Sequence, residues 1–401
     1  MKRILFLTLT LLTILVSCEK DKIEVHTVPI TDITNITYFD GLLHYGVTSN
    51  SPCEVCVLKA EKTTTKVEVP STIEIEGKIY SCTSIAPYAF SDCRELTTIT
   101  IPESIMRIEG YAFERCSKLT SITIPESVMG IGEGAFIGCS GLTTITIPES
   151  VTGISSYAFS ECSGLTTVTI PESVKGIDWK AFSFCSGLTS ITIPESVTRI
   201  GGYAFESCSN ITLVTIPKNV TSIDEGTFIG CSGLKTINIS KSVTKIGNSA
   251  FECCSGLTTV TIPDSVTSIG SRAFSECSGL TTITIPESVT GIGGEAFSRC
   301  SGLTTITIPE GVTKIGEGTF RGCSGLTTVT IPESVTSIGI EAFRDCSGLE
   351  SVVCKNNTPP SCYGDAFSDK SSIVLYVPQG SKEAYQNTYP WKDFKEIIEE
   401  E

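Results

Sequence analysis

Histidine is nearly absent from this sequence, in which His26 and His44 are the only two among 401 residues. Both precede the repeated part of the chain, so no histidine-based catalytic triad can be assembled along most of its length. The motifs H-E-x-x-H, G-x-x-x-x-G-K-[ST] and G-x-S-x-G are also missing. A lone C-x-x-C at Cys53 and Cys56 has no second ligand pair, which disfavours a metal site. The sequence therefore predicts a protein that is not an enzyme and needs no cofactor or metal.

Positive charge is scarce as well. The chain has 29 basic and 44 acidic residues, for a formal net charge of −15. With that sign we expect no nucleic-acid partner and no direct attraction to an anionic membrane surface. Apolar residues make up 40% of the chain and charged residues 18%, which indicates a folded rather than a disordered protein.

Long apolar runs are absent except for Ile4 to Val16, which follows Lys2 and Arg3. This run is too short to span a bilayer comfortably and predicts a secretory signal. It ends in Leu15-Val16-Ser17-Cys18, which resembles the lipobox of bacterial lipoproteins. The resemblance implies that Cys18 is lipidated; the alternative is an ordinary cleaved signal with a chance cysteine. Residues 19–22 partly resemble a surface-export signal of Bacteroides-type lipoproteins. The expected location is thus the bacterial outer membrane, with a lipid anchor as the only membrane contact. The protein is expected to be exposed on the cell surface, with an orientation toward the periplasm as the alternative.

What the sequence does have is a strict repeat. Phenylalanines recur at a constant step of 23 from Phe90 through Phe343, and prolines keep the same step with one exception, at Ser240. Cysteines follow the step at twelve positions: 93, 116, 139, 162, 185, 208, 231, 254, 277, 300, 323 and 346. A fixed period of this length with recurring aliphatic residues predicts a solenoid.

One unit, starting at Cys139, shows how each coil is built. Its β-branched run predicts a short strand with alternating sides, which Pro148 ends because it cannot donate to a continuing ladder. After the proline, Val151 and Ile154 are expected to turn back inward. The side chains predicted to face the core are Leu142, Ile145, Ile147, Val151, Ile154, Ala158, Phe159 and Cys162. No single coil can hide so many apolar side chains, so neighbouring coils must bury them, in a parallel sheet with about 4.8 Å between strands.

The pattern L-x-x-I-x-I-P followed by V-x-x-I-G-x-x-A-F-x-x-C resembles the leucine-rich repeats of the bacterial surface protein BspA and its relatives, also called the Treponema-type class. It covers Pro70 to about Leu349. The resemblance implies a leucine-rich repeat solenoid with a parallel β-sheet on the concave side, short turns or helical pieces on the convex side, and a cap at each end. The local departures from the pattern are Asn210, Ile211, Leu213, Ser240 and Cys253.

The domain boundaries follow from this pattern and from the sequences that flank it. Asp40-Gly41 predicts a hairpin at the N-terminal end, and the first repeat carries an insertion between Pro70 and Phe90. At the other end we expect a strand at 375–377, a helix capped by Ser381, and Tyr385, Trp391 and Phe394 closing the core. The predicted domains are a signal peptide (1–17), a lipid-anchored tether (18–32), an N-terminal β cap (33–69), the repeat array (70–353) and a C-terminal cap (354–401).

The nineteen cysteines of an exported chain ordinarily suggest disulfides. Cysteines in register on adjacent coils, however, have Cβ atoms near the 4.8 Å strand spacing, beyond the roughly 3.5–4.5 Å of a disulfide. The periodic cysteines are therefore predicted to be a ladder of buried, inert thiols. Off the period, Cys53 with Cys56 and Cys354 with Cys362 are candidate disulfides.

Two surface ladders are candidates for binding. The first is formed by threonines on the outward side of each strand: Thr144, Thr146, Thr167, Thr169, Thr259, Thr261, Thr282, Thr284, Thr305, Thr307, Thr328 and Thr330. The second is acidic and follows the prolines: Glu103, Glu126, Glu149, Glu172, Glu195, Asp264, Glu287, Glu310 and Glu333. The threonines have either a binding role or only good propensity for an exposed strand. The acidic residues are interpreted as a solvated rim, with calcium bridging as the alternative.

The leading hypothesis is a cell-surface lipoprotein that binds through its extended repeat surface. The resemblance implies adhesion, since BspA-like proteins bind host matrix proteins such as fibronectin and fibrinogen; host extracellular matrix proteins, surface proteins and glycans are the expected partners. A second hypothesis is a structural spacer or assembly protein of the cell envelope. A third is ice binding, because the T-x-T spacing resembles the threonine array of ice-binding solenoids.

Overall fold

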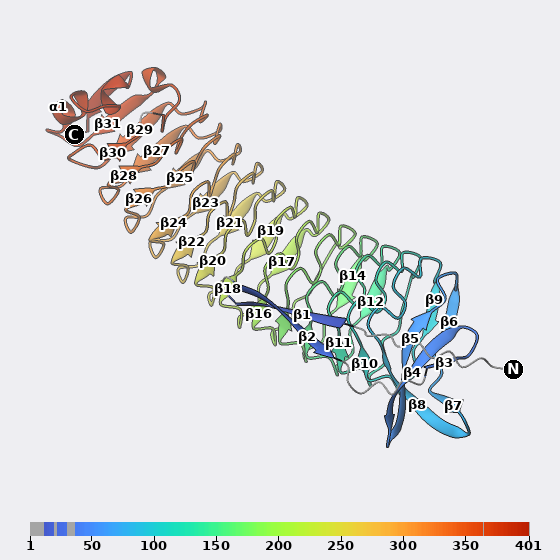
Figure 1. The fold of residues 1–401 in the computed structure, drawn as a ribbon. Helices are drawn as coiled ribbons and strands as arrows, with labels where there is room; N and C mark the ends of the chain where they lie inside the picture. The colour runs from blue at the N-terminus through green and yellow to red at the C-terminus, as the bar shows by residue number, and fades with distance from the viewer. Residues whose placement is uncertain (1–11, 20–21, 30–36, 364, 401) are drawn as a thin grey trace.

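The computed structural model describes residues 12–19, 22–29, 37–363 and 365–400. Successive coils stack into one elongated body, with the strands of the N-terminal cap at one end and helix α1 (Lys382–Gln386) at the other (Figure 1). Equivalent strands of neighbouring coils pair in parallel, so that Ile145 lies opposite Val168 and Ile154 opposite Ile177. The predicted parallel solenoid is confirmed.

One row of strands contains the predicted Thr-x-Thr segments and their equivalents near the ends of the solenoid. In chain order it consists of β6 (Lys66–Glu68), β9 (Thr98–Thr100), β12 (Thr144–Thr146), β14 (Thr167–Thr169), β17 (Leu213–Thr215), β19 (Thr236–Asn238), β21 (Thr259–Thr261), β23 (Thr282–Thr284), β25 (Thr305–Thr307), β27 (Thr328–Ile331), β29 (Ser351–Cys354), β31 (Val374–Val377) and β32 (Glu396–Glu399).

The sequence does not predict a second row of strands, which lies where a turn is expected. Most strands of this row are only two residues long. The alternation of apolar and polar residues that identifies a strand in a sequence cannot be recognised over so short a segment. The row begins with β8 (Lys78–Ile85) and continues through β10 (Arg107–Ile108), β11 (Gly130–Ile131), β13 (Gly153–Ile154), β15 (Gly176–Ile177), β16 (Arg199–Ile200), β18 (Ser222–Ile223), β20 (Lys245–Ile246), β22 (Ser268–Ile269), β24 (Gly291–Ile292), β26 (Lys314–Ile315), β28 (Ser337–Ile338) and β30 (Ser361–Cys362).

The third wall of each coil is made of turns, and no helix forms in the repeats between residues 90 and 349. The prediction of short turns or helical pieces on this side is confirmed, and turns are what form. In each coil the residues two before and two after the phenylalanine have positive φ, as at Tyr111 and Arg115 (both 56°). The backbone of this wall still bonds along the solenoid axis, since the Phe113 N–H donates to the carbonyl of Ala135 at 2.7 Å. We call this wall the turn face.

The core runs the length of the solenoid. All eight side chains predicted to face inward in the unit from Cys139 are buried, each with at most 3% of its surface exposed. The phenylalanine rings stack coil upon coil from Phe90 to Phe367, with centroids 5.0 to 5.6 Å apart. This stack passes beyond residue 353, so the coil geometry continues into the predicted C-terminal cap. Burial of each large side chain stabilises the fold by roughly 1.5–3 kcal/mol. This burial occurs only when neighbouring coils stack, because a single coil cannot cover its own side chains.

The N-terminal cap contains the predicted hairpin. Strands β3 (Thr37–Phe39) and β4 (Leu43–Asn50) pair antiparallel, and the Asp40 carboxylate accepts the N–H groups of Leu42 and Leu43 at 2.8 Å. Strand β5 (Cys53–Ala60) joins β4 to β8, and β7 (Thr72–Ile75) with β8 forms the expected insertion ahead of Phe90. The first coil therefore packs against a sheet rather than against water.

The C-terminal cap closes the last coil as expected, because Tyr385, Trp391 and Phe394 are buried. It contains α1 and the short 3-10 helices η1 (Lys370–Ser372) and η2 (Trp391–Asp393). Ser381 precedes α1, but its side chain makes no capping hydrogen bond, so that prediction is wrong. Glu399 of β32 takes over this role, since one of its oxygens accepts the N–H groups of Gly380 and Lys382 at 2.9 and 3.1 Å.

Ahead of the cap, β1 (Leu12–Glu19) and β2 (Lys22–Pro29) pair antiparallel in the segment predicted to hold the end of the signal and the tether. Ile23 and Val25 alternate with polar residues, which is compatible with a strand. Most of the predicted signal peptide and residues 30–36 lie outside the described residues. Cys18 belongs to β1, but its side chain is not among those described.

Candidate binding surface

The threonine face is formed by the twelve threonines predicted to point outward. In β12, Thr144 and Thr146 are exposed on either side of Ile145, which keeps only 3% of its surface accessible. The alternation follows from the two-residue period of a strand. Thr144 lies opposite Thr167 and Thr146 opposite Thr169, so the hydroxyls form two straight columns. Only Thr328 and Thr330, at the C-terminal end, are half-buried.

The columns are interrupted in the middle of the solenoid. Leu213 replaces a threonine and is 49% exposed, and the Asn238 side chain donates to Thr215 Oγ1 at 3.2 Å. The threonine face therefore consists of a short block on β12 and β14 and a longer block from β21 to β27. The predicted threonines are brought together within each block but not across the whole length.

A third threonine column was missed by sequence reasoning. Thr143, Thr166 and Thr189 precede the strands, and each hydroxyl donates to a backbone carbonyl one coil earlier, as Thr166 does to Thr143 at 3.1 Å. A threonine two residues before the buried isoleucine or valine of most coils carries this signal in the sequence. Because their hydroxyls are already engaged, these threonines fasten one coil to the next rather than offering free donors.

The acidic rim also has a structural role. Glu126 accepts the backbone N–H of Glu149 at 3.1 Å, and Glu195 accepts that of Lys218 at the same distance. Each such carboxylate caps the turn of the next coil. Within the described ranges no group of three or more histidine, cysteine or acidic side chains has the arrangement needed to hold a metal ion.

The periodic cysteines are free, buried thiols. From Cys116 to Cys346 each Sγ donates to the carbonyl of a phenylalanine in the preceding coil, as Cys139 does to Phe113 at 3.1 Å. Burial raises the pKa of Cys185 and of Cys231 to about 12, so both remain protonated and unreactive near neutral pH. The sequence did not predict their hydrogen bonds.

The four off-period cysteines of the candidate disulfides are free as well. Cys53 and Cys56 lie three residues apart on β5 and therefore point to opposite faces of the strand, which separates their sulfur atoms. Cys354 is buried and accepts a hydrogen bond from the Tyr385 hydroxyl at 3.1 Å, whereas Cys362 is half-exposed. Neither candidate disulfide is present in the described chain.

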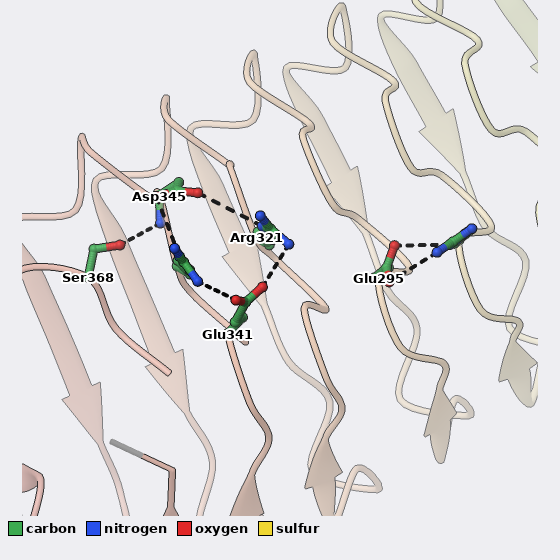
Figure 2. A network of polar contacts seen from close by, with 7 residues as sticks. Glu295, Arg321, Glu341, Asp345 and Ser368 are labelled. Atoms are coloured by element: carbon green, nitrogen blue, oxygen red, sulfur yellow. Dashed lines mark hydrogen bonds and ion pairs between the residues drawn. The ribbon is translucent and has the colours of Figure 1, made fainter. Parts of the chain in front are cut away.

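Ion pairs join neighbouring coils along the C-terminal half of the turn face, which the sequence reasoning did not single out. Arg272 Nε lies 2.9 Å from Glu295 Oε2. Figure 2 shows Arg321 reaching both Glu341, at 2.7 Å, and Asp345, at 3.9 Å. These side chains keep contact with water, so each pair adds at most about 1 kcal/mol. On this half of the turn face, solvent-accessible ion pairs therefore connect neighbouring coils.

The structure contains no helix in its described part that has the length and apolar character to cross a membrane.

Comparisons with known proteins point to leucine-rich repeat proteins. The model of the BspA-type leucine-rich repeat region matches residues 69–188, 152–281 and 244–374. A leucine rich cell surface protein of Faecalibacterium prausnitzii is 29% identical over 91% of this chain and 95% of that chain, with a TM-score of 0.61. A leucine-rich repeat protein of Bacteroides ovatus is 28% identical over 79% of this chain and 94% of that one, with a TM-score of 0.56.

The pneumococcal vaccine antigen PcpA shares the fold, with a TM-score of 0.57 at 20% identity over 91% of this chain and 98% of that chain. Among proteins with curated descriptions, none matches this sequence.

Proposed function

Because this chain belongs to the BspA-type leucine-rich repeat family, we propose that it is a cell-surface protein that holds a large partner on its threonine face. Solenoids of this family typically serve as binding scaffolds without catalysis. The observation that carries the proposal is the pair of exposed hydroxyl columns, held in register by parallel strands on a rigid, fully packed core.

The chemistry of the face suits a broad and extended contact. A threonine hydroxyl donates one hydrogen bond and accepts others, and its β-branched side chain has few rotamers to lose on binding. Each contact is modest, so affinity requires many of them over a surface of at least about 1,000 Å². The longer block, from β21 to β27, contributes eight threonines to such a contact. Host matrix or surface proteins are the partners we propose, with adhesion as the result.

We further propose that a lipid on Cys18 anchors the protein to the outer membrane. The lipobox-like Leu15-Val16-Ser17-Cys18 supports this anchor. The similar protein of Faecalibacterium prausnitzii is described as a cell surface protein, which supports surface exposure. Labelling of the cells with a radioactive fatty acid should mark the protein, and Cys18→Ala should abolish the label and release the protein from the membrane fraction.

The decisive experiment measures binding of purified residues 19–401 to immobilised fibronectin, fibrinogen and mucin glycans. One variant changes Thr282, Thr284, Thr305 and Thr307 to lysine. The matched control changes Thr244, Thr267, Thr290 and Thr313 to lysine; these are exposed threonines next to the second row of strands, in a column where Lys175 occurs naturally.

We expect saturable binding that the first variant loses and the control keeps. Equal binding by both variants would move the site away from the threonine face. If the unmodified chain binds none of the three probes, the structural spacer becomes the better hypothesis.

A further inference from the structure

The N-terminal half of the solenoid carries an open groove of about 630 Å³ along the edge of the turn face. It crosses five coils in the direction of the solenoid axis, from Arg94 and Arg115 at one end to Phe184 at the other. No residue of the threonine face lines it. The groove is therefore a separate surface with its own chemistry.

The groove exists because Gly138 stands where the adjacent coils carry large side chains. Its equivalents one coil earlier and one coil later are Arg115 and Glu161, and all three have positive φ. A Cβ at Gly138 would lie 3.2 Å from Cγ of Arg115. The missing side chain leaves the gap between them.

Serine hydroxyls line the floor of the groove. Ser117, Ser140 and Ser163 follow the periodic cysteines, and their hydroxyls make no hydrogen bond to any other group in the described part of the chain. By contrast, Ser127 and Ser150, on another wall, each donate to a carbonyl of the preceding coil. The serines of the groove are thus available as both donors and acceptors.

The two ends of the groove supply further groups. Arg94 and Arg115 are more than half exposed and share their charge with neighbouring carboxylates, Arg94 with Asp92 at 3.0 Å. Phe184 is 46% exposed, and no ring contact in the described chain covers it. Glu161 adds an acceptor beside it. The groove therefore combines an open aromatic face with hydrogen-bonding groups of both kinds and nearly balanced charge.

We propose that this groove binds a linear, neutral oligosaccharide that lies along the solenoid axis. Sugar hydroxyls both donate and accept, which matches serine, arginine and carboxylate side chains, while the apolar face of a sugar ring can cover Phe184. The coil spacing of 5.0 to 5.6 Å, measured between stacked phenylalanine rings, places one hydroxyl of the floor near each successive sugar ring.

A peptide strand fits this groove less well. The backbone N–H groups of Arg115 and Gly138 already donate to carbonyls of the next coil, at 2.7 and 2.8 Å. No row of free N–H groups remains for strand addition, which is how extended peptides gain affinity at a sheet edge. Recognition has to come from side chains, and these are hydroxyl-rich.

A second, smaller groove of about 440 Å³ lies further along the same face. Its Ser255 and Ser278 stand 92 residues, or four coils, after Ser163 and Ser186 of the first groove. The residue equivalent to Phe184 there is Glu276, so the second groove has no aromatic face. We therefore assign the sugar-binding role to the first groove, and the second serves as an internal comparison.

The test uses the purified chain and a glycan array that carries linear neutral oligosaccharides of glucose, xylose, mannose and N-acetylglucosamine beside acidic ones of galacturonate. Gly138→Glu fills the groove with the residue found one coil later. Gly322→Glu is the matched control, because its Cβ would also lie 3.2 Å from the Cγ of an arginine, Arg299, and it lies outside the groove. Circular dichroism melting confirms that both variants fold.

We expect neutral glycans to bind, with at least a tenfold loss of affinity in Gly138→Glu and in Phe184→Ser and no loss in Gly322→Glu. Absence of binding to every glycan, binding to acidic glycans alone, or equal binding by Gly138→Glu would each overturn the proposal. The variant with lysines at 282, 284, 305 and 307 should keep its binding to the linear neutral oligosaccharides, so failure of this site and failure of the threonine face are distinguishable.

Discussion

At the scale of single residues, a side chain at a given position of the repeat has the same task in most coils. Cysteine, serine and threonine each donate to a backbone carbonyl of the preceding coil, as Cys139 does to Phe113, Ser127 to Ile105 and Thr166 to Thr143. These bonds occur where strands are short or absent, so small polar side chains satisfy carbonyls that a longer ladder would otherwise satisfy. Much of the repeated sequence is therefore explained by coil-to-coil fastening rather than by binding.

The buried thiols predict a loss of stability in alkaline solution. Burial raises the pKa of Cys231 to about 12, whereas in the unfolded chain the thiol ionises near its ordinary value of about 9. Between these values the unfolded chain has released the proton and the native chain has kept it, so stability falls as the pH rises from about 9 to 12.

Chemical unfolding at pH 9 and pH 10 measures this effect. Cys231→Ser keeps a donor but does not ionise, so its difference in stability from the unmodified chain should shrink by about 1 kcal/mol over that interval. A difference that stays constant with pH would contradict the assignment of the pKa.

Glycine on the turn face makes a second residue-scale prediction. The ring of Tyr111 lies over Gly134, where a Cβ would come within 2.5 Å of it, and φ at Gly134 is 57°. Gly134→Ala should therefore displace the ring and lower the free energy of unfolding by about 1–3 kcal/mol. Gly130→Ala is the control, because nothing lies within 4 Å of its Cβ and it should change stability by less than about 0.5 kcal/mol. Equal effects in thermal melts would contradict this account.

At the scale of elements, the strands in which exposed and buried residues alternate could be predicted from the sequence. The two-residue strands, which have no such alternation, could not. Thr144-Ile145-Thr146 has a clear period of two, and the strand forms there. Gly153-Ile154 is too short to have a period, so its pairing in β13 was unpredictable. The turns of the turn face were predicted, but their positive-φ positions were not, because these are filled by Tyr111, Arg115 and similar residues, and only glycine signals such a backbone in a sequence.

The same contrast applies to the candidate sites. Outward threonines follow from alternation alone, so they could be predicted. The groove beside Gly138 could not, because it depends on a side chain that is missing between two large ones in adjacent coils.

The C-terminal cap gives a prediction at the element scale. Trp391 is fully buried, and its indole N–H donates to the carbonyl of Pro360 at 3.0 Å. Trp391→Ala should lower the free energy of unfolding of the C-terminal cap and the adjoining coils by about 3–5 kcal/mol. Hydrogen exchange should then speed up in the last coils, around β29 and β31, and remain unchanged near β12, since each coil contacts only its neighbours. Uniform faster exchange along the whole chain would show instead that the solenoid unfolds as one unit.

At the scale of the whole molecule, the constant step of 23 residues keeps every column in register and makes the coils interchangeable. Deletion of residues 278–300 removes one full step and joins Cys277 to Ser301, restoring the Cys-Ser-Gly-Leu sequence of every neighbouring junction. This variant should fold, with a melting temperature a few degrees lower and a length about 5 Å shorter, because it loses one interface among many similar ones. Deletion of residues 278–289 removes half a step and places strand residues of one coil against turn residues of the next. The thermal unfolding of this second variant should therefore no longer be cooperative. Circular dichroism and small-angle X-ray scattering measure both outcomes; if the two deletions destabilise the protein equally, register is not what holds the solenoid together.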